Sequence, residues 1–404
     1  MIFLLLFIIS VLLCGTIFIG PFSIRVYVTI MMVGLLFFQR QKLFYRIQPW
    51  NNSIYKTYIA FIIVMAMSLL ASGDFLAYNF PKKFLANYFV CIVCYFSLYA
   101  FVKTNNRIYM VCMVLSFILM LNSVVTILQF TGNSYGWLIG NIFEDISRNE
   151  DIMDSHGGDL LGLSLTPGIF GSTVTNAFMI AVLSPIALYC SSESREKIYK
   201  IIFIICYVVS FIACFATQQR AAFGLFLVGV AFAIIFNIRR KPWLIILVVF
   251  ILLFVFNNIL NYIENTDFGR LLDTDNTSRD VLKEKAVEFI YDNLLFGGPV
   301  KYAQIAGLDS AHHLLYDSWI TAGFLGFIFM IILFYRSLKL ATLNIITDFF
   351  KKRNSIYVNL SFMICMVYGL VHNTSYLSGD CIVFIMLAIV QLSMIHEKDK
   401  TLVH

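Results

Sequence analysis

The chain consists largely of apolar segments, each about as long as a membrane-spanning helix. A helix that crosses a bilayer needs roughly 20 mainly apolar residues, because unpaired backbone amides are too costly in hydrocarbon. Sixty per cent of the 404 residues are hydrophobic and 13% are charged, a balance that the surface of a water-soluble domain does not accommodate. We predict twelve transmembrane helices, over residues 2–20, 22–38, 57–73, 86–102, 108–130, 170–190, 199–216, 221–238, 242–261, 314–335, 356–373 and 379–395.

The predicted fold class is therefore an all-α polytopic membrane protein, with residues 1–404 as a single integral membrane domain. A β-barrel would need short strands that alternate apolar and polar residues, whereas runs such as WLIILVVFILLFVF are apolar on every face. The first segment lacks a basic leader and a small-residue cleavage site, so we expect a retained helix. The nine cysteines, including Cys91 and Cys94, lie in or beside apolar segments, and we expect them to be buried small hydrophobes.

Lysine and arginine sort to one side of this arrangement. With both termini placed in the cytoplasm, the internal connections and the C-terminal tail hold 19 of the 29 basic residues but five of the 23 acidic ones, as the positive-inside rule requires. The net charge of +6 therefore reflects topology and gives no support to nucleic-acid binding. No charged residue is expected at the middle of a helix, which argues against an ion-coupled carrier.

Two external connections, residues 131–169 and 262–313, are longer than a helical hairpin needs. Long ordered loops usually carry function. The second, which joins the ninth and tenth helices, contains DNTSRDVLKEKAVEFIYDN, a pattern that predicts an amphipathic helix on the membrane surface. We expect the functional residues on this external side.

Two histidines stand at the external entrance of the tenth helix. Ser310 is the expected N-cap, which places His312 in the first helical turn. The helix dipole there favours the neutral imidazole that a general base requires. Tyr316 shares the face of His312, while His313 and Asp317 are spaced to pair on another face. The alternative is that His312 only caps the helix or orders the loop.

Two arginines on the same side are candidate anion-binding residues. Arg220 is the only charge at the external end of the eighth helix, where a guanidinium suits a phosphate but also often snorkels to the interface. Arg279 lies in the first turn of the expected amphipathic helix, beside a capping-box-like pair formed by Thr277 and Asp280. Bound phosphate would favour a cation there, and local pairing with Asp280 is the alternative.

Two acidic motifs are weaker candidates. Asp273 and Asp275 form a DxD, the carboxylate pair of metal-dependent sugar transfer, but this tripeptide is common in acidic loops. His156 lies with Asp154 and Asp159 in DSHGGD. We interpret both motifs as solvated loops, and we expect neither a metal nor a cofactor.

Residues 277–327 carry the strongest family resemblance. TSRDVLKEKAVEFIYDNLLFGG and AHHLLYDSWITAGFLG resemble a Ser-Arg, an amphipathic helix, a Phe-Gly-x and a His-Asn followed by Gly-x-x-Gly, the pattern of the O-antigen polymerase and O-antigen ligase superfamily. QQRAAFGLF, ILQFTG and GIFGSTVTNAFMIAVLSPIAL are similar to further elements of that family. His313 replaces the family's asparagine and Gln219 replaces a serine.

This resemblance implies a GT-C-like membrane glycosyltransferase that is metal-independent and inverts the anomeric centre. It implies that His312 deprotonates the acceptor hydroxyl. Arg220 and Arg279 would hold the pyrophosphate of an undecaprenyl-pyrophosphate-linked oligosaccharide, and preorganised cations suit such a leaving group. His313, Tyr316 and Asp317 are the supporting residues.

The resemblance leaves two activities open, and the residues leave a third. A polymerase would join lipid-linked repeat units of O-antigen or capsular polysaccharide, and a ligase would move finished O-antigen onto lipid A-core. A lipid-linked sugar flippase is the non-enzymatic alternative. We favour the polymerase, in the bacterial inner membrane with its active site on the extracytoplasmic face. The expected partners are the lipid-linked oligosaccharide, the acceptor glycan, membrane lipid and a chain-length regulator.

Overall fold

The structure is a computed structural model that describes residues 1–15, 17–38, 52–143, 166–238, 277–308, 310–311, 313–371 and 376–402. Apart from one two-stranded hairpin, the elements in these ranges are helices. Seven helices of the described ranges are long and apolar enough to cross a membrane, and four shorter apolar helices accompany them. The protein is thus a mostly helical, polytopic membrane protein.

In chain order the elements are α1 (Ile2–Leu13), β1 (Phe18–Ile19), β2 (Phe22–Ser23), α2 (Ile24–Phe38), α4 (Ser53–Ser72), α5 (Phe80–Lys83), the π-helical η2 (Phe84–Phe89), α6 (Val90–Phe101), α7 (Asn105–Phe130), α8 (Ser134–Phe143), α10 (Thr173–Glu193), α11 (Lys197–Ala216), α12 (Arg220–Ile238), α14 (Thr277–Asp292), α15 (Pro299–Ala306), α16 (Leu314–Lys351), α17 (Ile356–Val371) and α18 (Cys381–Leu402).

Eleven of the twelve predicted spans coincide with an apolar helix of the described chain. The remaining span, 242–261, lies outside the described residues, so the count of twelve stays a prediction. The first span, predicted over 2–20, was too long, because α1 ends at Leu13. Beyond it, Gly20 adopts a φ of 65° and the chain turns back as an antiparallel hairpin of β1 and β2.

Helix α16 is longer than predicted, because it continues to Lys351 where a connection from residue 336 was expected. Ser337, Ala341, Asn344 and Asp348 are buried at helical spacing along this extension. Three of these four residues are polar, which concealed the helical face in the sequence. Conversely, the predicted loop 131–169 begins with a helix, α8.

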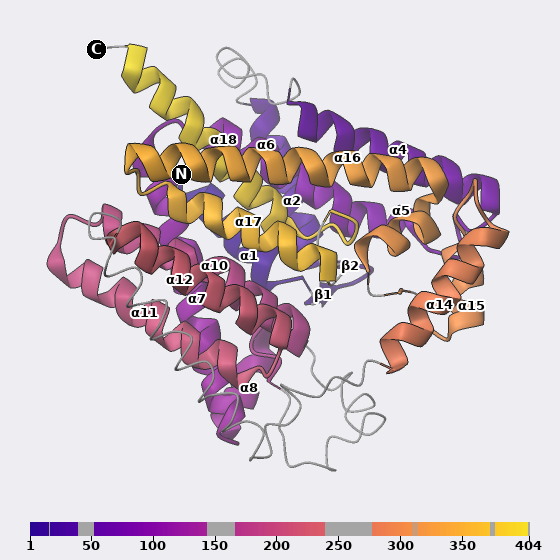
Figure 1. The fold of residues 1–404 in the computed structure, drawn as a ribbon, viewed down its shortest axis with the longest axis horizontal. Helices are drawn as coiled ribbons and strands as arrows, with labels where there is room; N and C mark the ends of the chain where they lie inside the picture. The colour runs from indigo at the N-terminus through magenta and orange to yellow at the C-terminus, as the bar shows by residue number, and fades with distance from the viewer. Residues whose placement is uncertain are drawn as a thin grey trace.

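Helix α10 is the central helix of one half of the bundle (Figure 1). It packs against α7, α11, α12 and α17, and most of its side chains are buried. Its neighbour α11 turns Ile198 and Ile201 outward with 62% and 57% of their surfaces exposed, as expected for a helix that faces lipid. In the other half, α16 packs along α4 and α17 while α18 packs on α6.

Helices α14 and α15 lie beside the beginning of α16, far from the C-terminus (Figure 1). α14 is the predicted amphipathic helix, since Leu282, Ala286 and Phe289 are buried at helical spacing. Ala286 and Phe289 join Tyr302 of α15 and Ile320 of α16 in a small apolar cluster. This cluster fixes α14 and α15 on the start of α16, where His313, Tyr316 and Asp317 lie.

Candidate functional site

Two glycine motifs allow the turn after α14 to lie directly on α16. The backbone N–H of Gly297 donates to Ser68 Oγ and that of Gly298 to the Ile320 carbonyl, both at 2.8 Å. A Cβ at Gly297 would collide with the Ile320 carbonyl oxygen, and one at Gly323 with the Leu295 carbonyl oxygen. Gly323 also adopts a φ of 66°, which favours glycine. The Phe-Gly-Gly and Gly-x-x-Gly motifs are therefore two sides of one contact.

Asp317, in the first turn of α16, holds the segment that leads into this helix. Its carboxylate accepts hydrogen bonds from the backbone N–H of Ala311 (2.6 Å), the backbone N–H of His313 (3.1 Å) and Ser310 Oγ (2.9 Å). The side chain is buried, with 3% of its surface exposed. Several donors compensate a buried carboxylate for its lost hydration, so Asp317 fixes the backbone on both sides of position 312.

This geometry corrects two details of the sequence interpretation. Helix α16 begins at Leu314 with His313 as its N-cap, so Ser310 is not the N-cap and His312 precedes the first helical turn. Asp317 does pair with His313, but through the backbone N–H of the histidine. Both details depend on the place where the helix begins, which shifts by a few residues without changing the apolar pattern.

The half-buried imidazole of His313 lies beside Tyr316, with the two ring centroids 4.8 Å apart. Its Nδ1 atom is buried and has no hydrogen-bond partner in the described part of the chain. Burial and the positive charge of Lys283 on α14 lower the pKa of His313 below its ordinary value. Both effects favour the neutral form of this imidazole.

A buried amide network connects two of the three other motifs of the family resemblance, ILQFTG and GIFGSTVTNAFMIAVLSPIAL. Asn122 and Gln129 of α7 meet Asn176 of α10, where Asn122 Nδ2 donates to Asn176 Oδ1 at 2.6 Å. The backbone N–H of Gly168 donates to Gln129 Oε1 at 2.8 Å, and Asn176 Nδ2 donates to the carbonyl of Thr166 at 2.6 Å. This network clamps residues 166–169, just before α10.

Arg220 is exposed and is the first residue of α12. The turn before it places Gln218 at a φ of 54°. Thr166 Oγ1 donates to the carbonyl of Ala216 in the same turn, at 3.4 Å. The amide network thus supports the turn that presents Arg220, on a helix that packs against α10, α11 and α17.

Arg279 is the third residue of α14, in the first helical turn, as predicted. His312 lies outside the described residues, as do both acidic motifs, Asp273 with Asp275 and DSHGGD. The structure therefore brings Ser310, His313, Tyr316 and Asp317 together at the start of α16.

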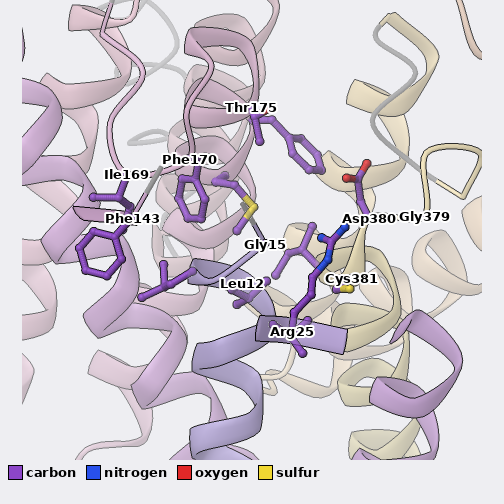
Figure 2. A pocket seen from close by; sticks show the side chains of 15 residues that line it. Leu12, Gly15, Arg25, Phe143, Ile169, Phe170, Thr175, Gly379, Asp380 and Cys381 are labelled. Carbon is purple, nitrogen blue, oxygen red and sulfur yellow. The ribbon is translucent and has the colours of Figure 1, made fainter. Parts of the chain in front are cut away.

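A cavity of about 200 Å³ contains charged residues that the sequence interpretation missed. Figure 2 shows the guanidinium of Arg25, near the beginning of α2, pointing toward Asp380, just before α18, with the rings of Phe143 and Phe170 on the other side. Arg25 Nη2 also donates to Asn87 Oδ1 at 2.5 Å. An apolar-walled cavity with a few convergent polar groups is typical of a small-molecule site.

The signal for this cavity in the sequence is weak. Arg25 and Asp380 each stand at the edge of a predicted span, where a charge commonly lies at the membrane interface. They are 355 positions apart, so only the packing of α1, α2, α10 and α18 brings them to one cavity. Within the described ranges, no group of three or more His, Cys, Asp or Glu side chains has the arrangement of a metal site.

Residues 205–331 match the model of the family described as O-antigen ligase. No curated protein matches the chain. The matched segment begins within α11 and ends within α16, and so contains Arg220, Arg279, His312, His313 and Asp317. This match supports the resemblance to the O-antigen polymerase and O-antigen ligase superfamily, and with it an enzyme activity of the glycosyltransferase type.

Proposed function

We propose that the chain is an inner-membrane glycosyltransferase that polymerises O-antigen or capsular repeat units from undecaprenyl-pyrophosphate-linked donors. The observation that carries this proposal is the match over residues 205–331, because this segment contains every predicted catalytic and pyrophosphate-binding residue. The buried carboxylate of Asp317, which bonds the backbone at positions 311 and 313, holds the residues on either side of His312 and so supports this role. Preorganisation of this kind is what a general base needs.

In the proposed reaction, His312 removes the proton from a hydroxyl of the acceptor sugar. The hydroxyl oxygen attacks the anomeric carbon of the donor glycan from the face opposite the pyrophosphate. The new C–O bond forms with inversion as the bond to the pyrophosphate oxygen breaks, and undecaprenyl pyrophosphate leaves with the electron pair. Arg220 and Arg279 stabilise the charge that develops on the leaving group, and the proton stays on His312 until solvent removes it.

His313 has a different proposed role. Its neutral imidazole packs on Tyr316, and its backbone N–H binds Asp317. A buried Nδ1 without a partner in the described chain is poorly placed to exchange protons with a substrate. We therefore assign the base to His312 and treat His313, Tyr316 and Asp317 as positioning residues.

A ligase that transfers finished O-antigen to lipid A-core is the second candidate function. The description of the matching family as O-antigen ligase favours it. Polymerase and ligase use the same donor linkage, so they differ in the acceptor sugar rather than in the chemistry at the anomeric carbon.

A chromosomal deletion in the source bacterium distinguishes the two. Loss of a polymerase leaves a single repeat unit on the lipid A-core, whereas loss of a ligase leaves lipid-linked polymer that never reaches the core. Lipopolysaccharide gels of the deletion strain, with and without the gene restored, give the answer. Normal polymer on the core in the deletion strain contradicts both assignments.

A lipid-linked sugar flippase is the less favoured alternative, and the charged cavity of Arg25 and Asp380 is the feature that such a carrier would use. The carrier predicts that Arg25→Gln abolishes function while His312→Ala does not. Purified protein with lipid-linked repeat units in detergent solution has no membrane to transport across. Formation of glycan product in that assay therefore excludes a purely transporting role.

A further inference from the structure

A second, larger cavity lies at the opposite end of α4 from the candidate site. The C-terminal end of α4 lies beside the turn after α14, where Ser68 accepts a hydrogen bond from Gly297. Its N-terminal end lies beside the middle of α16, where the carbonyl of Ser53 accepts one from Arg336. The cavity at the N-terminal end of α4 has a volume of about 590 Å³ and lies between α4, α6, α16 and α18. No residue of the proposed catalytic machinery lines it.

The polar part of this cavity is positively charged and partly fixed in position. Arg336 Nη1 donates to the carbonyl of Ser53 at 3.0 Å and to Thr57 Oγ1 at 2.6 Å, which holds the guanidinium against the first turn of α4. Lys339 follows at helical spacing, with its ammonium 6.0 Å from the ring centroid of Tyr335. The N-terminus of α4 contributes the positive end of its dipole. Among the described residues that line the cavity, none is acidic.

The wall opposite α16 carries a buried amide with an unused donor. Gln391 of α18 has 6% of its surface exposed. Its Oε1 accepts hydrogen bonds from the hydroxyls of Tyr95 (2.7 Å) and Tyr99, whereas its Nε2 is buried and has no partner within the described ranges. A buried donor left without an acceptor is costly, and a turn of this amide toward the cavity would let a ligand oxygen supply one.

The remaining wall is apolar and opens toward the outside of the bundle. Leu340 and Met394 line the cavity. Tyr335 and Leu343, at its margin, have 62% and 53% of their surfaces exposed. Exposed apolar side chains such as these are suited to contact with acyl chains at the membrane. The cavity thus joins a cationic floor to a hydrocarbon-facing wall, which is the chemistry of a charged lipid rather than of a soluble anion.

We propose that this cavity binds the headgroup of an anionic phospholipid. The lipid phosphate lies between Arg336 and Lys339, the Gln391 amide turns toward the cavity to donate to a headgroup oxygen, and an acyl chain runs along Leu343. Basic pockets between transmembrane helices recognise anionic headgroups in this way. The proposal does not depend on the glycosyltransferase activity, because the cavity is separate from the candidate site.

Native mass spectrometry of the detergent-solubilised full chain tests the proposal, with dioleoyl-phosphatidylglycerol and dioleoyl-phosphatidylcholine as probes. We expect one phosphatidylglycerol to be retained in preference to phosphatidylcholine. Lys339→Gln should weaken this retention about fivefold, the effect of about one cation near a phosphate, and it leaves the Arg336 bonds to α4 intact. Arg336→Lys, which keeps the charge but loses the planar fork of donors, should weaken it less than Arg336→Gln.

Lys197→Gln is the matched control, because Lys197 is an exposed cation at the start of α11 and does not line the cavity. Equal retention of the two lipids would overturn the proposal. So would unchanged phosphatidylglycerol retention in Lys339→Gln, or an equal loss in Lys197→Gln. Displacement of the lipid by an equal concentration of glycerol phosphate would show that the cavity recognises a soluble phosphate and not a lipid.

Discussion

Asp317 shows how one buried side chain can hold the backbone beside a candidate site. Its carboxylate satisfies two backbone N–H groups and one hydroxyl just before α16, while the helix dipole at its first turn favours its negative charge. The sequence spacing predicted the pairing of positions 313 and 317. It did not predict that the donor would be the backbone, because that depends on the residue at which the helix begins.

Replacing Asp317 by Asn tests this role. An amide keeps the shape but loses the charge and presents two N–H donors, so we expect the free energy of unfolding to fall by about 3 kcal/mol, the scale of charged hydrogen bonds. We expect product formation to fall more than tenfold. Ser310→Ala removes a single donor and is the control, with an expected loss of about 1 kcal/mol. A wild-type melting temperature and activity for Asp317→Asn would contradict the role.

The depressed pKa of His313 predicts a dependence of stability on pH. The unfolded chain binds a proton near the ordinary pKa of about 6.5, but burial and Lys283 disfavour the imidazolium in the folded state. The unfolded state therefore binds more protons just below that pH, so stability is fully present above about pH 6.5 and falls as the pH drops through the window below it.

Melting temperatures between pH 5.5 and 7.5 measure this effect. His313→Gln should flatten the dependence and Lys283→Gln should reduce it. Lys285→Gln is the matched control on α14, because Lys285 donates to the carbonyl of Ile305 and does not lower the pKa of His313. A wild-type dependence in His313→Gln would mean that another group is responsible.

At the scale of elements, the apolar runs predicted the positions of the helices more accurately than their ends. α1 stops at Leu13 because the chain turns into the β1–β2 hairpin, and α16 continues to Lys351 because polar residues form its buried face. Arg25 and Asp380 could not have been paired from the sequence, since nothing local relates α2 to the beginning of α18. The helix α14, by contrast, was predicted because its buried residues recur at helical spacing.

The contact between the Phe-Gly-Gly turn and α16 predicts an unequal response to two glycine substitutions. Gly323→Ala must both adopt a positive φ and displace the Leu295 carbonyl, whereas Gly307→Ala, at a φ of 78°, meets no atom of the described chain within 4 Å. Strain from positive φ alone costs about 1–2 kcal/mol. We expect Gly323→Ala to lower the melting temperature clearly more than Gly307→Ala, and equal losses would contradict the close contact.

At the scale of the whole molecule, the sorting of basic residues predicts an orientation that cysteine labelling can test. The native cysteines are buried, apart from the half-buried Cys14, so an engineered exposed cysteine should dominate the reaction. A membrane-impermeant maleimide should label Lys301→Cys on α15 in intact spheroplasts, but Lys197→Cys on α11 only after the membrane is opened. The reverse pattern would place the candidate site in the cytoplasm.

The central claim is that His312 is the base of a glycosyl transfer, and the most direct measurement is glycan product formed by the purified full chain from lipid-linked repeat units. His312→Ala should reduce the rate by at least about 100-fold, the lower range for loss of a general base. His313→Ala is the control, because it removes the neighbouring imidazole instead. This variant should retain a substantial part of the rate. Normal product formation by His312→Ala would contradict the proposed mechanism.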